Sequence, residues 1–282
     1  MNIIDAIILG LIQGLTEFLP ISSTGHLTLA GKFMGLISEE HPEQWTSFIA
    51  VIQLGTMISI LVYFRKDLWN IFFEFIQNNI QKRMKYSEQS LNSKLGWMII
   101  AGTIPIVIIG LLFKDAIEGA LTKNLYVIGG SLIVLAIILA IAERTAKFNK
   151  DMQDITFFDS VMIGIAQAVA LIPGSSRSGT TITGGLFLGL KRDVAARFSF
   201  LLSVPAVLAS GLLQLKESLA FINSDIAINL TVATLISGIS GYLAIDFLLK
   251  FLKKNTTFVF IFYRIVLGIL ILLFLYLNII KP

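Results

Sequence analysis

Long apolar stretches separated by short polar loops dominate the 282-residue chain. A helix needs about 20 mostly apolar residues to cross the hydrocarbon core of a bilayer. Six stretches meet this requirement and predict transmembrane helices: Thr46–Phe64, Leu95–Phe113, Leu125–Ala142, Phe198–Leu215, Ile226–Asp246 and Phe258–Ile280. The fifth ends on Asp246 and the sixth contains Arg264. We interpret both as snorkelling or paired residues near segment ends and leave them out of the predicted site.

Two further apolar segments are broken in the middle. Ala6–Leu36 contains Pro20, a Ser-Ser-Thr run and Gly25, and the apolar runs on either side are about half the length that a membrane crossing needs. Ser160–Leu190 is interrupted in the same way. Such backbone is tolerated at membrane depth only where it is buried in protein or lines a wet cavity. Both segments therefore predict re-entrant helix–loop–helix pairs.

The two broken segments align without a gap when the chain is shifted by 154 residues. Gly10–Leu36 then lies on Gly164–Leu190, with eight identical pairs among 27 positions: 10/164, 13/167, 22/176, 25/179, 31/185, 33/187, 35/189 and 36/190. Each half then holds one re-entrant pair and three crossings. Because three is odd, the halves enter the membrane in opposite senses. The prediction is an all-α integral membrane fold, one domain over 1–282, with inverted repeats at about 1–145 and 155–282.

Composition agrees with a polytopic membrane protein, since 55% of the residues are hydrophobic and only 14% are charged. The absence of cysteine excludes disulfides, thiol nucleophiles and thiolate metal sites. The first segment lacks a basic region and a small-residue cleavage site, so we expect no removable signal peptide. The net charge of +4 does not indicate nucleic acid binding here; its distribution reports membrane orientation.

The positive charges favour one orientation. Of the 22 Lys and Arg residues, 15 fall in four loops that share one side: Arg65–Lys94, Glu143–Asp159, Lys191–Arg197 and Lys250–Lys254. Five fall on the other side: Lys32, Lys114, Lys123, Lys216 and Lys281. The positive-inside rule then places both termini outside. Within the first inside loop, Trp69, Phe72, Phe73 and Ile76 recur at helical spacing before a basic run. This pattern fits a helix on the inner membrane surface, with a solvated loop as the alternative.

The second broken segment carries the motif PGSSRSGTT over Pro173–Thr181. The Arg177 guanidinium offers a fork of donors that matches phosphate or carboxylate oxygens. Hydroxyl groups add donors, glycines let backbone N–H groups approach a ligand, and a helix N-terminus after the loop favours an anion. The residues of both loops that we expect to bind substrate phosphate are Ser22, Thr24, Ser176, Ser178 and Thr181.

The first broken segment carries QGLTEFLPISSTGH over Gln13–His26. An ionisable group such as Glu17 at membrane depth is a functional-site candidate, and a carboxylate would repel an anionic ligand unless it served acid–base or metal chemistry. Gln13 and Glu17 share one helix face, where they could hold Mg²⁺ or Ca²⁺ beside substrate phosphate. With His26 and the hydroxyl residues, the parts suffice for phosphoester or phosphoanhydride hydrolysis.

Structural roles are the alternatives for these residues. Small and hydroxyl residues often serve only helix packing in membranes. Glu17 and Arg177 could form a buried structural pair, and His26 could be a hydrogen-bonded core residue. Gln53 and Gln167 are expected to be helix–helix hydrogen-bonding residues rather than ligands.

These motifs, together with VIQLG at Val51–Gly55 and the late pair Tyr263–Arg264, resemble the integral-membrane undecaprenyl-diphosphate phosphatases, the UppP or BacA family associated with bacitracin resistance. The resemblance covers essentially the whole chain. It implies hydrolysis of undecaprenyl diphosphate to undecaprenyl phosphate and inorganic phosphate, a step that recycles the lipid carrier for peptidoglycan. It also implies a bacterial cytoplasmic (inner) membrane location with the active site open to the outer side.

The resemblance assigns roles to matching positions. In the family's (E/Q)xxxE motif the first residue here is Gln13, so Glu17 carries the acid–base or metal role largely alone. The PGxSRSxxT motif is complete and carries over Ser176, Arg177, Ser178 and Thr181 as phosphate binders. Ser23 and His26 carry over as competing nucleophiles.

The expected partners are a polyprenyl diphosphate substrate and membrane lipids, with a divalent metal as cofactor. Two rival functions stay open: a lipid-phosphate or anion transporter using the same site, and a non-catalytic lipid-binding resistance protein. A homodimer also stays open.

Overall fold

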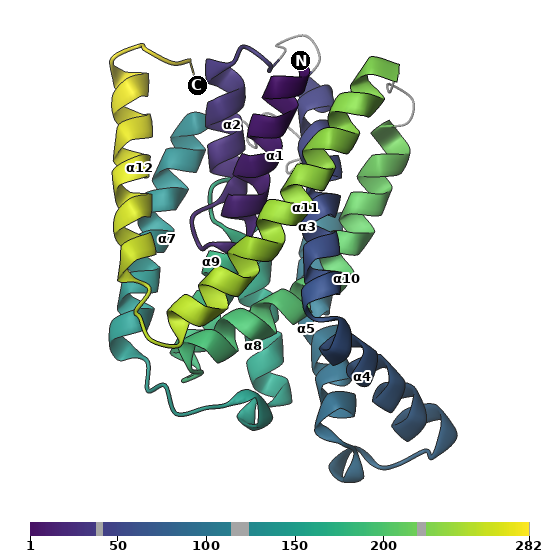
Figure 1. The fold of residues 1–282 in the computed structure, drawn as a ribbon. Helices are drawn as coiled ribbons and strands as arrows, with labels where there is room; N and C mark the ends of the chain where they lie inside the picture. The colour runs from purple at the N-terminus through teal and green to yellow at the C-terminus, as the bar shows by residue number, and fades with distance from the viewer. Residues whose placement is uncertain (38–41, 114–123, 219–223, 282) are drawn as a thin grey trace.

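The protein folds into a bundle of helices (Figure 1). The computed structural model describes residues 1–37, 42–113, 124–218 and 224–281. Along the chain the α-helices are α1 (Ile3–Phe18), α2 (Ser23–Phe33), α3 (Pro42–Tyr63), α4 (Arg65–Ile76), α5 (Leu91–Leu112), α7 (Leu125–Thr145), α8 (Phe157–Val169), α9 (Arg177–Phe187), α10 (Arg192–Ser218), α11 (Ser224–Leu252) and α12 (Phe258–Tyr276). The described residues contain no β-strand apart from an isolated bridge between Lys150 and Leu190.

Six of these helices are long and apolar enough to cross a membrane, as the sequence predicts. The spans are Trp45–Tyr63, Leu91–Leu112, Leu125–Thr145, Arg192–Leu213, Ala227–Leu252 and Phe258–Tyr276. The bounds shift at several ends: α10 begins at Arg192 and α11 runs on to Leu252, past the predicted stretch, α5 begins at Leu91, and α12 ends at Tyr276. Arg and Lys have good helix propensity, so a basic flank can extend a helix.

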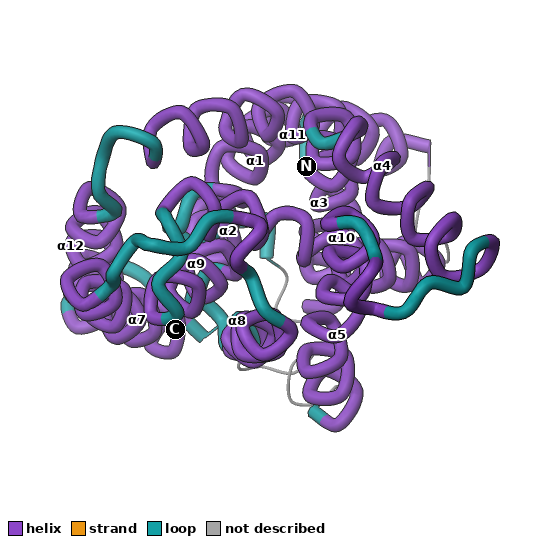
Figure 2. The backbone as a smooth tube through the Cα atoms, turned by 90° about the horizontal axis from the view of Figure 1, so that it is seen from below, coloured by secondary structure: helices purple, strands orange, loops and turns teal. Residues whose placement is uncertain are grey.

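Both broken segments form the two helices that the sequence predicts. Helix α1 begins at Ile3 after the N-cap Asn2, and α8 begins 154 residues later at Phe157 after the N-cap Thr156; each start carries a capping box. Seen along the bundle, α2 and α9 lie in the middle, among the other helices (Figure 2). These shared starts support the predicted relation of the halves. The inverted repeat, the domain bounds built on it and the re-entrant insertion in a bilayer stay predictions.

The four basic loops lie at one end of the bundle and both termini at the other (Figure 1). Two of the five basic residues assigned to the opposite side, Lys114 and Lys123, fall outside the described residues. Leu68–Ile80, whose spacing predicts a surface helix, forms α4 and the short π-helix Gln77–Gln81. The solvated-loop alternative is therefore wrong for this stretch.

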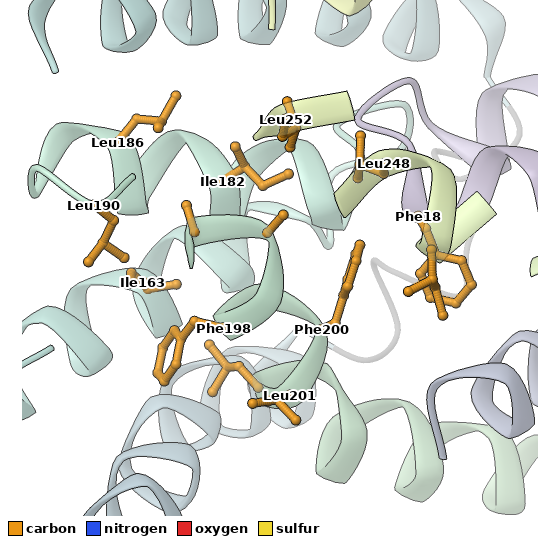
Figure 3. Close-up of a cluster of buried hydrophobic side chains, with 14 of the residues drawn as sticks. Phe18, Ile163, Ile182, Leu186, Leu190, Phe198, Phe200, Leu201, Leu248 and Leu252 are labelled. Carbon is orange, nitrogen blue, oxygen red and sulfur yellow. The ribbon is translucent and has the colours of Figure 1, made fainter. Parts of the chain in front are cut away.

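An apolar cluster fixes the end of α1 (Figure 3). The Phe18 and Phe200 rings meet edge to face with their centroids 5.3 Å apart, and both side chains are buried together with Leu248 of α11. Because Phe18 directly follows Glu17, this contact holds the last turn of α1 against α10 and α11. The packing thus positions the one carboxylate that the predicted site requires.

Glycines bring α1 and α3 close to α11. A Cβ added at Gly55 would collide with the carbonyl oxygen of Thr234 and the Oγ of Ser237, whereas one added at Gly110 meets open space. Small residues at such crossings let helix backbones approach closely. We expect Gly55→Ala to lower the free energy of unfolding by about 1–3 kcal/mol through overpacking. The measurement is thermal unfolding of the purified protein in detergent, with Gly110→Ala as the control; equal melting temperatures for the two variants would contradict this packing.

Candidate active site

The two broken segments turn in the same way. Helices α2 and α9 each begin directly after a serine whose backbone is left-handed, with φ of 76° at Ser22 and 68° at Ser176. A residue with a side chain seldom adopts this conformation. Each serine hydroxyl compensates by accepting the backbone N–H three residues on, from Gly25 or Gly179, at 3.2 Å. The caps fix the direction of both half-helices, whose first N–H groups have no carbonyl of their own helix to bind.

Glu17 lies at the point where the two loops meet. Its Oε2 accepts hydrogen bonds from Ser23 Oγ at 2.6 Å and Gln13 Nε2 at 3.0 Å. Its Oε1 accepts from Arg177 Nη2 at 2.7 Å and Gln53 Nε2 at 3.0 Å. Ser23 and Arg177 are the first residues of α2 and α9 and occupy equivalent positions in the 154-residue alignment. One carboxylate therefore binds a hydroxyl from one loop and a guanidinium from the other.

This cluster is buried but leaves polar groups unpaired. Glu17 and Gln13 are 7% and 0% exposed. Among the described residues, Arg177 Nη1 has no acceptor and Gln13 Oε1 has no donor, although both atoms are buried. A buried polar group without a partner costs about 1–3 kcal/mol, and more when it is charged. An anion bound against Arg177 would satisfy the free guanidinium nitrogen, so the site has the chemistry of an oxyanion receptor.

His26 is held in a single tautomer by its neighbours. Its Nδ1 lies 2.7 Å from the carbonyl oxygen of Ser22, which can only accept, so Nδ1 carries the proton. In the neutral ring Nε2 then offers a lone pair, which accepts the hydroxyl of Tyr263 at 2.7 Å. The two rings are nearly parallel, at 4° and 5.6 Å between centroids. His26 is therefore oriented as a base beside the site, and within the described residues its ring makes no hydrogen bond to Ser23 or Glu17.

Arg264 requires a correction. We interpret it from sequence as a snorkelling or paired residue outside the site, but its side chain is fully buried. Its Nη2 donates to the Ser175 carbonyl at 2.9 Å and its Nη1 to the Pro20 carbonyl at 3.5 Å. It thus joins the two loops, and its Nη1 lies where a Cβ on Gly179 would come within 2.7 Å. The prediction is wrong because the second turn of α12, which carries Arg264, packs inside the bundle and does not lie at its surface. The interpretation of Asp246 agrees with its pairing to Lys250.

The expected phosphate binders have different surroundings. Ser178 Oγ donates to the Leu19 carbonyl at 3.0 Å and so links the loops. The Thr181 hydroxyl is fully buried, donates to the Arg177 carbonyl at 2.7 Å and contacts Ser199 Oγ at 2.5 Å. Thr24, on the first turn of α2, is partly exposed. Thr181 thus supports the turn that carries Arg177, whereas phosphate binding by the partly exposed Thr24 stays a prediction.

Gln13 and Glu17 offer oxygen ligands to a divalent cation. Among the described residues, no group of three or more His, Asp or Glu side chains could hold a metal ion by itself. The buried acceptor Gln13 Oε1 and the adjacent Glu17 carboxylate nevertheless fit a cation whose other ligands are substrate phosphate and water, the usual habit of Mg²⁺. Such a cation would neutralise phosphate charge when bound.

Sequence reasoning missed three residues that complete the cluster: Gln53, Tyr263 and Arg264. The sequence predicts that Gln53 forms a helix–helix hydrogen bond, and it does, but the acceptor is the Glu17 carboxylate. The sequence feature that could have identified Gln53 as a site residue is its polar side chain inside an apolar membrane-spanning stretch. Gln167, the counterpart of Gln13, is fully buried, and its side-chain amide has no hydrogen-bond partner in the described part of the chain. The helix–helix hydrogen bonding predicted for Gln167 is not seen.

Comparison with known proteins shows the family of this chain. Residues 6–270 match the sequence model of the family described as "Bacitracin resistance protein BacA". A protein of Syntrophobacter fumaroxidans named undecaprenyl-diphosphatase is 57% identical over 268 residues, which cover 95% of each chain. Proteins with the same name from Chloroherpeton thalassium and Myxococcus xanthus are 50% and 46% identical, covering 96% and 100% of this chain and 96% and 92% of theirs. The chain therefore belongs to the BacA family of bacitracin resistance proteins.

Proposed function

We propose that this protein is an undecaprenyl-diphosphatase, which hydrolyses undecaprenyl diphosphate to undecaprenyl phosphate and inorganic phosphate. The relatives named above carry this activity in their names. The observation that carries the proposal is the Glu17 carboxylate, bound by the Ser23 hydroxyl at 2.6 Å and the Arg177 guanidinium at 2.7 Å. A base, a hydroxyl and an arginine with a free nitrogen are the parts of a phosphoryl-transfer site. The names of these relatives do not favour a transporter or a non-catalytic lipid-binding protein.

The chemistry has two steps. Ser23 Oγ attacks the terminal phosphorus while Glu17 takes the hydroxyl proton; the bond from that phosphorus to the bridging oxygen breaks, and undecaprenyl phosphate leaves. Water then attacks the phosphoserine and gives a proton to His26, while Glu17 returns its proton to Ser23 Oγ as the phosphorus–Oγ bond breaks; this releases inorganic phosphate and restores Ser23. Arg177 Nη1 and the N–H groups at the start of α2 and α9 stabilise charge on the transferred phosphoryl group. The short Ser23–Glu17 hydrogen bond favours serine over His26 as the nucleophile.

The protein would act in the bacterial cytoplasmic membrane. The six apolar helices support a multi-pass protein, and the four basic loops at one end of the bundle support an orientation with both termini outside. We propose that the site opens to the outer side, so that the diphosphate reaches the two loops from that side while the prenyl chain stays among helices and lipid.

Removal of the proposed base gives the first test. We expect Glu17→Gln to lower kcat for phosphate release by about 10²–10⁴-fold, the usual contribution of general base catalysis. The amide keeps the shape of the side chain but cannot take the serine proton. Phosphate release from a long-chain prenyl diphosphate by purified enzyme measures the effect. Thermal unfolding of the variant controls for loss of the Arg177 ion pair, and near-normal turnover in folded Glu17→Gln would contradict the role.

Chelation tests the proposed cation. We expect EDTA to lower phosphate release by at least about tenfold and added Mg²⁺ or Ca²⁺ to restore it, because a cation supplies charge stabilisation worth several kcal/mol. In Gln13→Ala the metal concentration for half-maximal activity should rise, since a buried oxygen ligand is lost. Full activity in EDTA would remove the cofactor from the proposal and leave the protein residues in their roles.

A further inference from the structure

Helix α4 exposes a row of aromatic side chains. Trp69, Phe72 and Phe73 lie on one helical face and are 66%, 60% and 51% exposed. Ile80, in the π-helix that follows, is 64% exposed. In water such an apolar face is rarely left without a partner. In Figures 1 and 2 α4 lies at the edge of the bundle, so its aromatic face contacts whatever surrounds the protein.

The opposite side of α4 is fixed to the bundle. The Phe75 ring packs on Trp97 of α5 with 5.0 Å between centroids. Asn79 donates to Ser93 Oγ at 3.1 Å and accepts the Trp97 indole N–H at 3.0 Å. With these contacts in place, α4 cannot roll to bury its aromatic face without breaking its attachment to α5.

Packing on α5 also sets the level of α4. The candidate membrane span of α5 begins at Leu91, and Ser93 and Trp97, which the π-helix Gln77–Gln81 and α4 contact, lie in its first two turns. Helix α4 therefore lies at the end of a membrane-spanning segment, where hydrocarbon gives way to headgroups. Trp and Phe on one face and basic residues beside it are the pattern of interfacial helices.

The charges around α4 are predominantly positive. Lys82, Arg83 and Lys85 follow it and are exposed. The carboxylates of α4 are already engaged: Asp67 pairs with Arg197 at 2.5 Å and Glu74 accepts from Asn92 at 2.8 Å. One free carboxylate lies nearby, that of the exposed Glu88 in the turn Tyr86–Glu88, so the surface stays net positive and complementary to a phosphate headgroup.

We propose that α4 and the basic run Lys82, Arg83 and Lys85 form a binding surface for anionic phospholipid, with the aromatic face inserted among acyl chains and the basic residues on the headgroups. Basic residues at a membrane surface each favour anionic lipid, and three together give a preference on the order of 10- to 100-fold over zwitterionic lipid. This surface is separate from the Glu17 cluster, and the proposal does not depend on the phosphatase activity.

Trp69 is a built-in probe for this proposal. The full-length protein is reconstituted in vesicles of phosphatidylcholine with a small fraction of brominated phosphatidylglycerol or of brominated phosphatidylcholine. Subtracting the signal of Trp69→Phe gives the quenching of Trp69 alone. We expect stronger quenching by the brominated anionic lipid than by the zwitterionic one.

The charge variants decide the outcome. The excess quenching should disappear in the triple variant Lys82→Gln, Arg83→Gln, Lys85→Gln. It should persist in the charge-matched control Lys147→Gln, Lys253→Gln, Lys254→Gln, whose residues are exposed in other loops at the same end of the bundle. Absence of quenching by either lipid would place α4 in water and overturn the proposal. Equal quenching by both lipids, or loss of the excess in the control as well, would overturn a specific site at α4.

Discussion

Ser23→Ala is expected to lower kcat for phosphate release by about 10⁴–10⁶-fold, because removing a nucleophile costs most of what the whole catalytic group contributes. The hydroxyl is the group nearest to the base, with its Oγ 2.6 Å from Glu17 Oε2. His26→Ala should cost about 10²–10⁴-fold as the loss of an acid–base group. Single-turnover phosphate release from the two purified variants separates these roles.

The nucleophile assignment is open to contradiction from either variant. Near-normal turnover in Ser23→Ala would exclude the serine. A larger loss in His26→Ala than in Ser23→Ala would transfer the nucleophile to the imidazole, whose Nε2 now accepts the Tyr263 hydroxyl. Tyr263→Phe is a useful companion, since it frees that nitrogen and keeps the ring; in a serine mechanism it should alter the rate far less than Ser23→Ala.

Arg177→Ala is expected to lower kcat/KM by about 10³–10⁵-fold, the range for an arginine that stabilises a transferring phosphoryl group. Two effects combine: the free Nη1 no longer meets the phosphate, and Glu17 loses its ion-pair partner. Arg177→Lys restores a charge but not the planar fork, so it should recover only part of the loss.

A matched control for Arg177 is available on α10. Arg197 also pairs with a carboxylate, Asp67, at 2.5 Å, but its side chain is 46% exposed and far more open than that of Arg177 at 14%. Arg197→Ala should change phosphate release less than twofold. If Arg177→Ala and Arg197→Ala had similar activities in folded protein, the guanidinium would not belong to the catalytic cluster.

The sequence predicts the parts of this site that lie within one segment or repeat between two. Pro20 and the serine run break α1 from α2, and the 154-residue shift pairs Ser22 with Ser176, both of which are left-handed N-caps. The same shift pairs Ser23 with Arg177, the two groups that meet on Glu17. Apolar length alone is enough to predict the six membrane-spanning helices.

The residues that the sequence does not predict come from helices that only tertiary packing brings in. Gln53 reaches Glu17 from α3, and Tyr263 and Arg264 reach the loops from α12. Arg264 is the clearest case. A charged side chain near the start of an apolar helix can extend to the membrane surface, or it can be buried in the interior of the bundle. The two outcomes have the same sequence pattern. Only the carbonyl oxygens of Pro20 and Ser175, placed by the folded loops, decide between them.

Release of inorganic phosphate from undecaprenyl diphosphate by detergent-purified protein tests the central claim most directly, namely that the two loops form one hydrolytic site around Glu17. Wild-type protein is compared with Ser23→Ala, from the first loop, and Arg177→Ala, from the second. The account predicts release by the wild type and a loss of at least about 10³-fold in each folded variant. No release by folded wild type, or loss in only one of the two variants, would contradict it.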